Sequence, residues 1–234
     1  MIHIFHLGLL SIALLTSGIQ NELSHEDELM GKFDPATHSD FVLIESPRTS
    51  KSGIYLRKQA YEKAKEMMDA AALDGINLTI ISATRNFNYQ KGIWERKWSL
   101  PKYQGWTDKD KAAEILKYSS MPGTSRHHWG TDVDFNSVEP SYFAQGNGKK
   151  IYDWLVKNGP SYGYHQTYTS KELGRTGYNE EKWHWSYLPL AKEYLKEYNK
   201  CITYDHFINF KGASVAKEVD VIELYVNGID NNLK

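Results

Sequence analysis

The sequence predicts an α+β domain with a small, largely antiparallel sheet flanked by helices. The chain of 234 residues is long enough for one domain with a hydrophobic core, and its 41% apolar and 24% charged residues are ordinary for a globular protein. Helical and strand-like segments mix without the regularity of βαβ units, which favours an α+β arrangement. The formal net charge of −1 gives no field that would favour binding to nucleic acid or to an anionic membrane.

The first fifty residues divide into an apolar run and a polar segment. Residues 4–18 are mostly apolar, but the run is shorter than the roughly 20 residues that span a bilayer, and it ends with small residues at Thr16 and Gly18. We expect a signal peptide over residues 1–20, no stable membrane span, and export to the periplasm or the extracellular space. An uncleaved anchor or a buried helix would produce the same run. For residues 21–50 we expect an irregular N-terminal arm.

Four elements are expected between residues 51 and 119. Helix formers dominate residues 56–74, and Gly75 is a natural C-terminal stop, so this segment predicts a helix. The short β-branched run over residues 76–84 predicts a strand. Residues 86–98 have a helical composition with an asparagine near the N-cap, and residues 107–119 open with a threonine cap and an acidic first turn.

The second half of the chain also mixes helical and strand-like segments. Proline and glycine mark a turn over residues 121–130, and glycine closes a later helix. The expected elements are a strand over 131–135, a helix over 148–159, strands over 162–168 and 182–188, and a helix over 188–200. The C-terminal extension, residues 201–234, has apolar residues at a mostly helical spacing over 214–229, so we expect it to be helical.

Titratable side chains gather around the predicted turn. The single cysteine, Cys201, excludes a disulfide within the chain and a cysteine-based zinc site, so a metal site would need histidine and carboxylate ligands. His127 and Asp134 lie on either side of Gly130, and a turn there can fold a ligand before it toward one on the following strand. Asp132 and Asp134 would share one face of that strand. Taken alone, such a histidine and aspartate are more often a surface pair.

A second group of such residues lies some fifty residues downstream. Glu181 and His184 have the spacing E-x-x-H, in which one residue can bind a metal and the other can take a proton from water. Trp183 and Trp185 would shield this segment from solvent. The alternative is a buried strand with one hydrogen-bonded histidine. Combined with the pair around Gly130, the segment completes the ligand set of a catalytic zinc with three protein ligands and an open fourth position.

A third segment adds a positively charged side chain. Arg85 directly follows the predicted strand over 76–84 and opens a helix, so its guanidinium could point into a cleft and hold a carboxylate or steady an oxyanion. Gln90 lies about one helical turn further on and could bind the same ligand. A solvated residue at a helix start is the alternative for Arg85.

With these three segments, the chain resembles the VanY-type D-alanyl-D-alanine carboxypeptidases, zinc enzymes of bacterial cell-wall metabolism. These belong to a larger group, the LAS group, with D-Ala-D-Ala dipeptidases and phage-type peptidoglycan endopeptidases. The family pattern S-x-H-x-x-G-x-A-x-D aligns with residues 125–134, and E-x-W-H aligns with residues 181–184. The usual strand followed by arginine, with glutamine five residues later, aligns with Arg85 and Gln90. The resemblance covers roughly residues 50–200, so we expect the zinc carboxypeptidase domain over 51–200.

The resemblance implies a role for each matching residue. It implies that Zn²⁺ is bound by His127, Asp134 and His184, that Glu181 is the catalytic base, that Arg85 stabilises the developing oxyanion, and that Ser125 and Gln90 help to seat the substrate. The zinc site would lie in a cleft on the sheet. Asp132 stands where the family commonly has alanine. We expect it to hydrogen-bond a ligand histidine or pair with Arg126, with competition for the metal as the alternative, and we expect His128 to pack rather than to bind metal.

The implied reaction is hydrolysis of the C-terminal peptide bond of peptidoglycan stem peptides with release of D-alanine, by a monomer. Three alternatives stay open: an L,D-carboxypeptidase, an endopeptidase or D-Ala-D-Ala dipeptidase of the same group, and a zinc-stabilised module that binds muropeptides without turnover. An intact glutamate and arginine argue against the last of these, because a protein that only binds needs no catalytic base.

Overall fold

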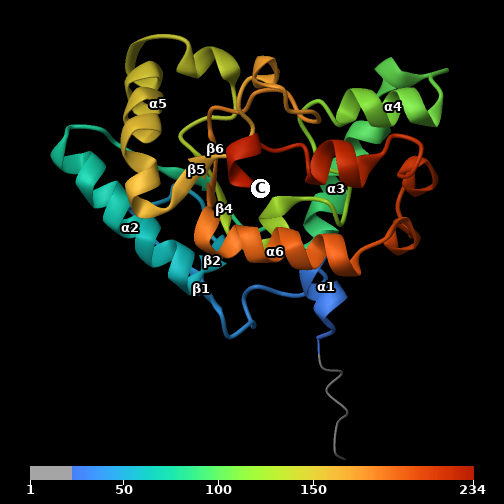
Figure 1. Ribbon diagram of the computed structural model, residues 1–234, viewed down its shortest axis with the longest axis horizontal. Coiled ribbons are helices and arrows are strands. Elements are labelled where there is room, and N and C mark those ends of the chain that lie inside the picture. The colour runs from blue at the N-terminus through green and yellow to red at the C-terminus, as the bar shows by residue number, and fades with distance from the viewer. Residues whose placement is uncertain (1–22) are drawn as a thin grey trace, which may run out of the picture.

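The computed structural model describes residues 23–234 and confirms the α+β prediction (Figure 1). Four short strands form an antiparallel sheet in the order β3-β4-β6-β5. Their bounds are Ile80–Ser82 for β3, Asp132–Phe135 for β4, Tyr164–Gln166 for β5 and His184–Tyr187 for β6. A separate two-stranded sheet pairs β1 (Phe41–Leu43) with β2 (Tyr55–Arg57). The predicted signal peptide, residues 1–20, lies outside the described residues.

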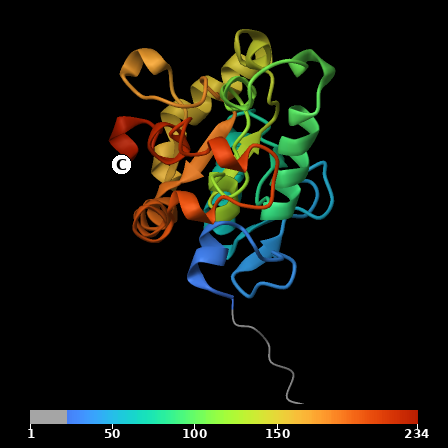
Figure 2. The same cartoon turned by 90° about the vertical axis from the view of Figure 1, so that its right-hand side faces the viewer.

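Helices surround the four-stranded sheet in both ribbon views (Figures 1 and 2). The helices α2 (Lys58–Leu73) and α5 (Gly146–Asn158) share one hydrophobic cluster with the strands. A second cluster joins α1 (His25–Leu29), α3 (Phe87–Trp98), α4 (Asp108–Ile115) and α6 (Leu188–Cys201) with the C-terminal segment. None of the helices in residues 23–234 has both the length and the apolar character needed to cross a bilayer.

The two central strands, β4 and β6, have one apolar and one polar face. Val133 and Phe135 of β4 and Trp185 and Tyr187 of β6 belong to the cluster with α2 and α5. Because successive side chains of a strand point to opposite faces, the residues between them lie on the other side of the sheet. These are Asp132, Asp134, His184 and Ser186, all of them buried. The prediction that Asp132 and Asp134 share a face is confirmed, and this face carries the site described below.

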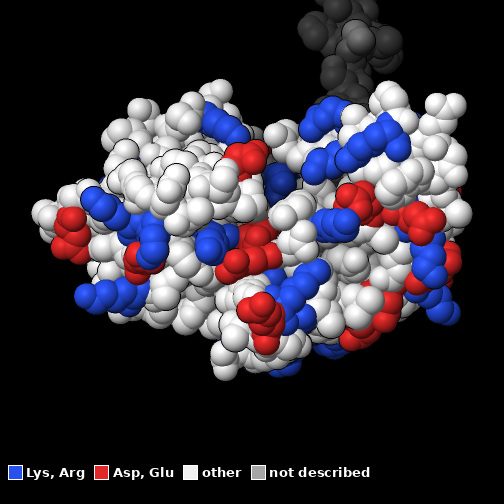
Figure 3. All heavy atoms as spheres, turned by 90° about the horizontal axis from the view of Figure 1, so that it is seen from above, with Lys and Arg blue, Asp and Glu red and all other residues white. Residues whose placement is uncertain are grey.

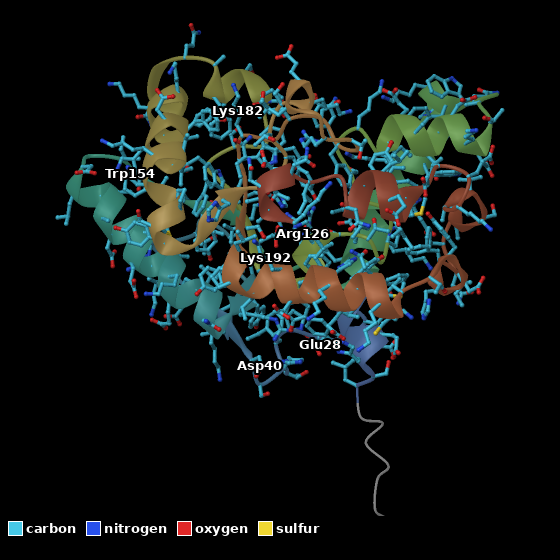
Figure 4. The ribbon with its side chains drawn as sticks, in the orientation of Figure 1. Glu28, Asp40, Arg126, Trp154, Lys182 and Lys192 are labelled. Carbon is cyan, nitrogen blue, oxygen red and sulfur yellow. The ribbon has the colours of Figure 1, made fainter. Side chains whose placement is uncertain are left out.

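The predicted caps of two helices are confirmed. The side chains of Asn86 and Thr107 accept hydrogen bonds from the backbone at the starts of α3 and α4. The predicted helix over 56–74 is wrong at its start, because β2 occupies Tyr55–Arg57. Arg57 is held there by the carbonyl of Trp129, and its guanidinium pairs with Glu28 and Asp40, which are labelled on the lower side of the folded chain in Figure 4. These partners are distant in sequence and override the local helical composition.

Two regular elements, α1 and β1, lie within residues 21–50, where the sequence predicts an irregular arm. Helix α1 is five residues long, and its end buries Leu29 and Met30 against the second hydrophobic cluster. Such a short element shows no periodicity that could be recognised in the sequence. The arm is thus packed on the domain rather than extended from it.

The C-terminal extension, which we expect to be helical, folds as several short helical turns. The turns are Ala213–Val215 and Ile222–Val226. Between them, Asp220 has a φ of 51°, a left-handed conformation that a continuous right-handed helix does not allow. The apolar side chains of the segment are still buried in the second cluster, and the indole of Trp94 in α3 donates to the carbonyl of Lys211.

Candidate metal centre and cleft

The structure brings together the three side chains that the sequence predicts as metal ligands. One donor atom from each of His127, Asp134 and His184 lies within 4.8 Å of the others, and all three residues are buried. Asp134 and His184 are direct partners across β4 and β6. His127 comes from a 3-10 turn, Arg126–Trp129, that ends at Gly130. Gly130 has a φ of 69°, and a β-carbon there would collide with the ring of Phe41, so this turn requires glycine.

Hydrogen bonds determine which ring nitrogen of His127 and of His184 is free to bind a metal. Nδ1 of His127 lies 2.7 Å from the carbonyl of Ala83, which can only accept, so Nδ1 carries the proton and Nε2 keeps its lone pair. Nε2 of His184 lies 2.9 Å from Asp132 Oδ1, so Nδ1 is the free nitrogen of this ring. Asp134 Oδ1 lies 3.5 Å from His127 Nε2 and 3.2 Å from His184 Nδ1.

These three free atoms fit a bound cation. In the described residues, His127 Nε2 and Asp134 Oδ1 are buried without a hydrogen-bond partner. Buried polar atoms normally find a partner, so two orphaned atoms at one point call for a ligand. Imidazole nitrogen and carboxylate oxygen are suitable donors for a divalent transition metal. Burial raises the pKa of Asp134, but His127 and His184 outweigh burial and hold this pKa well below its ordinary value.

Asp132 orients His184 from behind. Its Oδ1 accepts from His184 Nε2 and, at 3.1 Å, from Arg126 Nε, and its Oδ2 accepts from the hydroxyls of Thr131 and Ser186. Arg126 also donates to Ser186 at 2.8 Å and lies near the centre of the molecule (Figure 4). Asp132 therefore makes both contacts expected of it, to a ligand histidine and to Arg126. Burial raises the pKa of Asp132, but Arg126 and His184 outweigh this effect and keep the carboxylate ionised.

The replacement Asp132→Asn is expected to lower the affinity for a divalent metal by about 10- to 100-fold. The amide keeps the shape of the side chain but removes the negative charge that makes His184 a better donor. Competition with a chromophoric chelator measures the affinity, and circular dichroism checks the fold. Ser186→Ala serves as the matched control, since it removes one partner of Asp132 and leaves the bond to His184. Unchanged metal affinity in folded Asp132→Asn protein would contradict this role.

Glu181 provides a carboxylate beside the metal centre. Its Oε2 lies 3.8 Å from His184 Nδ1, and the residue is 7% exposed. Burial raises the pKa of Glu181 to about 7, although the neighbouring His184 acts in the opposite direction. A carboxylate with a pKa close to neutral suits both accepting and returning a proton.

Arg85 and Ser125 also lie beside the centre. The backbone N–H of Arg85 donates to the carbonyl of His127 at 3.1 Å, and Arg85 Nε is buried without a partner in the described residues. Ser125 is 1% exposed, and its hydroxyl is likewise unpartnered. Both residues border a small cavity of about 20 Å³ together with His127, Glu181 and His184. Four of the predicted functional side chains thus face the same space as His127.

His128 packs, as expected from the sequence. Its Nδ1 lies 2.6 Å from the carbonyl of Arg85, and its Nε2 accepts from the backbone N–H of Gly123 at 3.1 Å. Burial lowers the pKa of His128 to about 3, so the ring is neutral. The imidazole ties the segment of Arg85 to the loop before Ser125.

Gln90 is placed differently from the other predicted site residues. Its side chain is 1% exposed, its Nε2 donates to the carbonyl of Ser120 at 2.7 Å, and it lines neither the small cavity nor the larger cleft described below. Gln90 holds the loop that leads to Ser125, and its contact with substrate stays a prediction.

A cleft of about 860 Å³ opens beside the small cavity and shares Arg85, Tyr118, Ser119 and Glu181 with it. Figure 3 shows a depression near the centre of one face, with basic and acidic side chains beside it. The sequence did not single out several residues of these two spaces: Arg96, Lys97, Tyr118, Ser119, Ser120, Val138, Glu139, Tyr168 and Tyr178.

Comparisons with known proteins agree with these features. The family model VanY, D-alanyl-D-alanine carboxypeptidase, matches residues 53–190. A D-alanyl-D-alanine carboxypeptidase of Enterococcus faecalis is 28% identical over 145 residues, which are 62% of this chain and 52% of the relative. A protein of the same name from Enterococcus faecium is 27% identical over 179 residues, 76% of this chain and 50% of the relative. The chain spans about half the length of these curated relatives.

Solved structures share the fold. The structure of VanYB in complex with D-alanine-D-alanine is 25% identical with a TM-score of 0.52, covering 71% of this chain and 92% of that one. The LdcB LD-carboxypeptidase has a TM-score of 0.53 at 21% identity, covering 84% of this chain and 78% of that one.

Proposed function

The chain belongs to the VanY D-alanyl-D-alanine carboxypeptidase family, and from this premise we propose that it releases D-alanine from peptidoglycan stem peptides by zinc-dependent hydrolysis of their C-terminal peptide bond. The observation that carries the proposal is the convergence of His127, Asp134 and His184 beside the buried carboxylate of Glu181. The D-alanine-D-alanine bound in the related VanYB structure supports the substrate class.

The donor geometry supports zinc. Zinc binds nitrogen and oxygen ligands at about 2.0–2.2 Å in a tetrahedron, so that two ligand atoms are separated by about 3.3–3.6 Å. Asp134 Oδ1 lies 3.5 Å from His127 Nε2 and 3.2 Å from His184 Nδ1, close to this spacing. A related VanY of the same fold, 22% identical with a TM-score of 0.50, was solved in complex with Zn(II). His127, Asp134 and His184 would hold the ion.

Each residue around the candidate metal centre would have a separate role in the reaction. When bound, zinc polarises a carbonyl group and lowers the pKa of a water molecule to about 7. Glu181 would accept the proton of the attacking water and return it to the leaving amine. Arg85, whose Nε has no partner in the described residues, would stabilise the negative charge that develops on the carbonyl oxygen. The free hydroxyl of Ser125 would donate to the substrate in the small cavity.

Identification of the products tests this function. The zinc-loaded protein is incubated with a stem pentapeptide, a stem tetrapeptide and D-Ala-D-Ala, and the products are analysed by mass spectrometry. We expect loss of one D-alanine from the pentapeptide, which chelation of zinc prevents. Cleavage of the tetrapeptide instead indicates an L,D-carboxypeptidase, and cleavage of the dipeptide or of cross-linked peptides indicates the other reactions of this group. Binding of muropeptides without any release would overturn the enzymatic proposal.

Export is part of the same proposal. Stem peptides lie outside the cytoplasmic membrane, so the enzyme would have to be exported to reach its substrate. The signal peptide predicted over residues 1–20 would direct this export. We also propose that the exported protein acts as a monomer.

A further inference from the structure

Two arginines have no side-chain partner among residues 23–234, and both line the cleft. All six arginines lie within residues 23–234. Four of them form hydrogen bonds or ion pairs through the guanidinium: Arg48 with Asp69, Arg57 with Glu28 and Asp40, Arg126 with Asp132, and Arg175 with backbone carbonyls. Arg85 and Arg96 form none with the described residues, and both line the cleft of about 860 Å³. Unpaired arginines at a cleft indicate an anionic ligand.

Lys97 adds a third cation to the same wall. It is half-buried, and its Nζ donates to the hydroxyl of Ser119 at 2.5 Å, but no carboxylate of the described residues lies within ion-pair distance. Burial lowers the pKa of Lys97, and the like charges of Arg96 and Arg85 act in the same direction. Glu181, on the same cleft, acts in the opposite direction but forms no ion pair with Lys97 in the described residues. A partly buried ammonium without a carboxylate in contact is unfavourable, and the carboxylate of a ligand would relieve this cost.

The position of Lys97 indicates which carboxylate it binds. Its partner Ser119 borders both the cleft and the small cavity that contains Glu181 and His184. In a substrate cleaved at its last peptide bond, the terminal carboxylate follows the scissile carbonyl by one residue, so it must be bound next to the catalytic groups. We propose that Lys97, with Arg96 beside it, binds this free α-carboxylate and thereby selects peptides that end one residue after the cleaved bond. This inference rests on the proposed function. Among the reactions of this peptidase group, it favours the carboxypeptidase reaction.

A structural explanation competes with this proposal. Arg96 and Lys97 lie in the last turn of α3, where basic side chains interact favourably with the helix C-terminus. That interaction is available to an exposed lysine and requires neither burial in the cleft nor a bond to Ser119. It predicts that loss of Lys97 changes stability and leaves the choice between substrates unchanged.

The first experiment compares two pentapeptides that differ only in ending as a free acid or as an amide. For Lys97→Met, we expect kcat/KM on the acid to fall about 10- to 100-fold, mainly through KM, as for the loss of a hydrogen bond to a charged group. The rate on the amide stays at the wild-type level, and Lys97→Arg retains part of the preference for the acid. Lys63→Met is the matched control, since it removes a lysine of α2 whose partner is the exposed Glu66. Equal losses on both peptides, or none, overturn the proposal.

The second experiment measures binding and does not depend on turnover. Zinc-loaded Glu181→Gln protein is titrated with the same two peptides by calorimetry. We expect the acid to bind about 10- to 100-fold more tightly than the amide, and Lys97→Met in this background to remove the difference. If the wild-type protein cleaves neither peptide while this difference persists, the carboxylate site stands and the proposed reaction fails. If both peptides bind equally well before Lys97 is replaced, the carboxylate site is refuted.

Discussion

Replacement of His127 by alanine is expected to empty the metal centre and reduce D-alanine release to the rate measured without protein. The variant keeps only Asp134 and His184 as protein donors, and two donors in a buried site do not replace the hydration of a divalent cation. Zinc content by atomic emission and D-alanine release from the pentapeptide measure the two effects. Both should fall together, because the proposed hydrolysis requires the ion.

The control for this variant is a histidine away from the centre. His206 lies in a short turn of the C-terminal segment, and its side chain bonds to Thr203 and to no other residue of 23–234. His206→Ala should retain one zinc per chain and the wild-type rate. Chelation of the wild-type protein should reproduce the His127→Ala rate, and added zinc should restore activity only to the wild type. A His127→Ala protein with normal zinc content would show that the ligand set is wrong.

Replacement of Glu181 by glutamine is expected to keep the zinc and lower kcat by about 100- to 10,000-fold. Glutamine has the size of glutamate but cannot take the proton from water, so binding and folding survive while proton transfer is lost. Steady-state release of D-alanine and the zinc content of the same sample separate these two effects.

The neighbouring Glu180 provides the control. It lies 3.9 Å from Lys182 and is more exposed than Glu181, so Glu180→Gln should retain nearly the full rate. A wild-type rate in Glu181→Gln would remove this residue from the mechanism and leave the base unassigned.

The sequence was a good guide where the relevant chemistry is local. His127, Gly130 and Asp134 lie within one short segment, and the period of a strand is enough to put Asp132 and Asp134 on one face. The partner of that strand was not predictable. The combined ligand set and the family resemblance bring His184 to the same ion as Asp134, but no local pattern shows that the two residues are direct partners across β4 and β6, because strand pairing between segments fifty residues apart depends on the whole fold.

Other features depend on contacts that a local pattern does not contain. Helical spacing places Gln90 near Arg85, but the carbonyl of Ser120 fixes the direction of its side chain. A lysine in the last turn of a helix is ordinary, so the sequence around Lys97 does not indicate a cleft. Its position there becomes visible only in the folded chain, where it contacts Ser119 of a neighbouring loop. The helical spacing of the C-terminal segment agrees with its helical turns, but it does not show the break at Asp220, which adopts a left-handed conformation.

The alternation along β4 and β6 ties the chemistry of this protein to its folding. The same four-residue strands supply the buried core with one set of side chains and the candidate metal centre with the other. A one-residue insertion or deletion in either strand would exchange the two sets, placing aromatic rings where the ion should sit and carboxylates in the hydrophobic interior. A change in the length of either strand is therefore expected to destroy the fold and the candidate metal centre in one step.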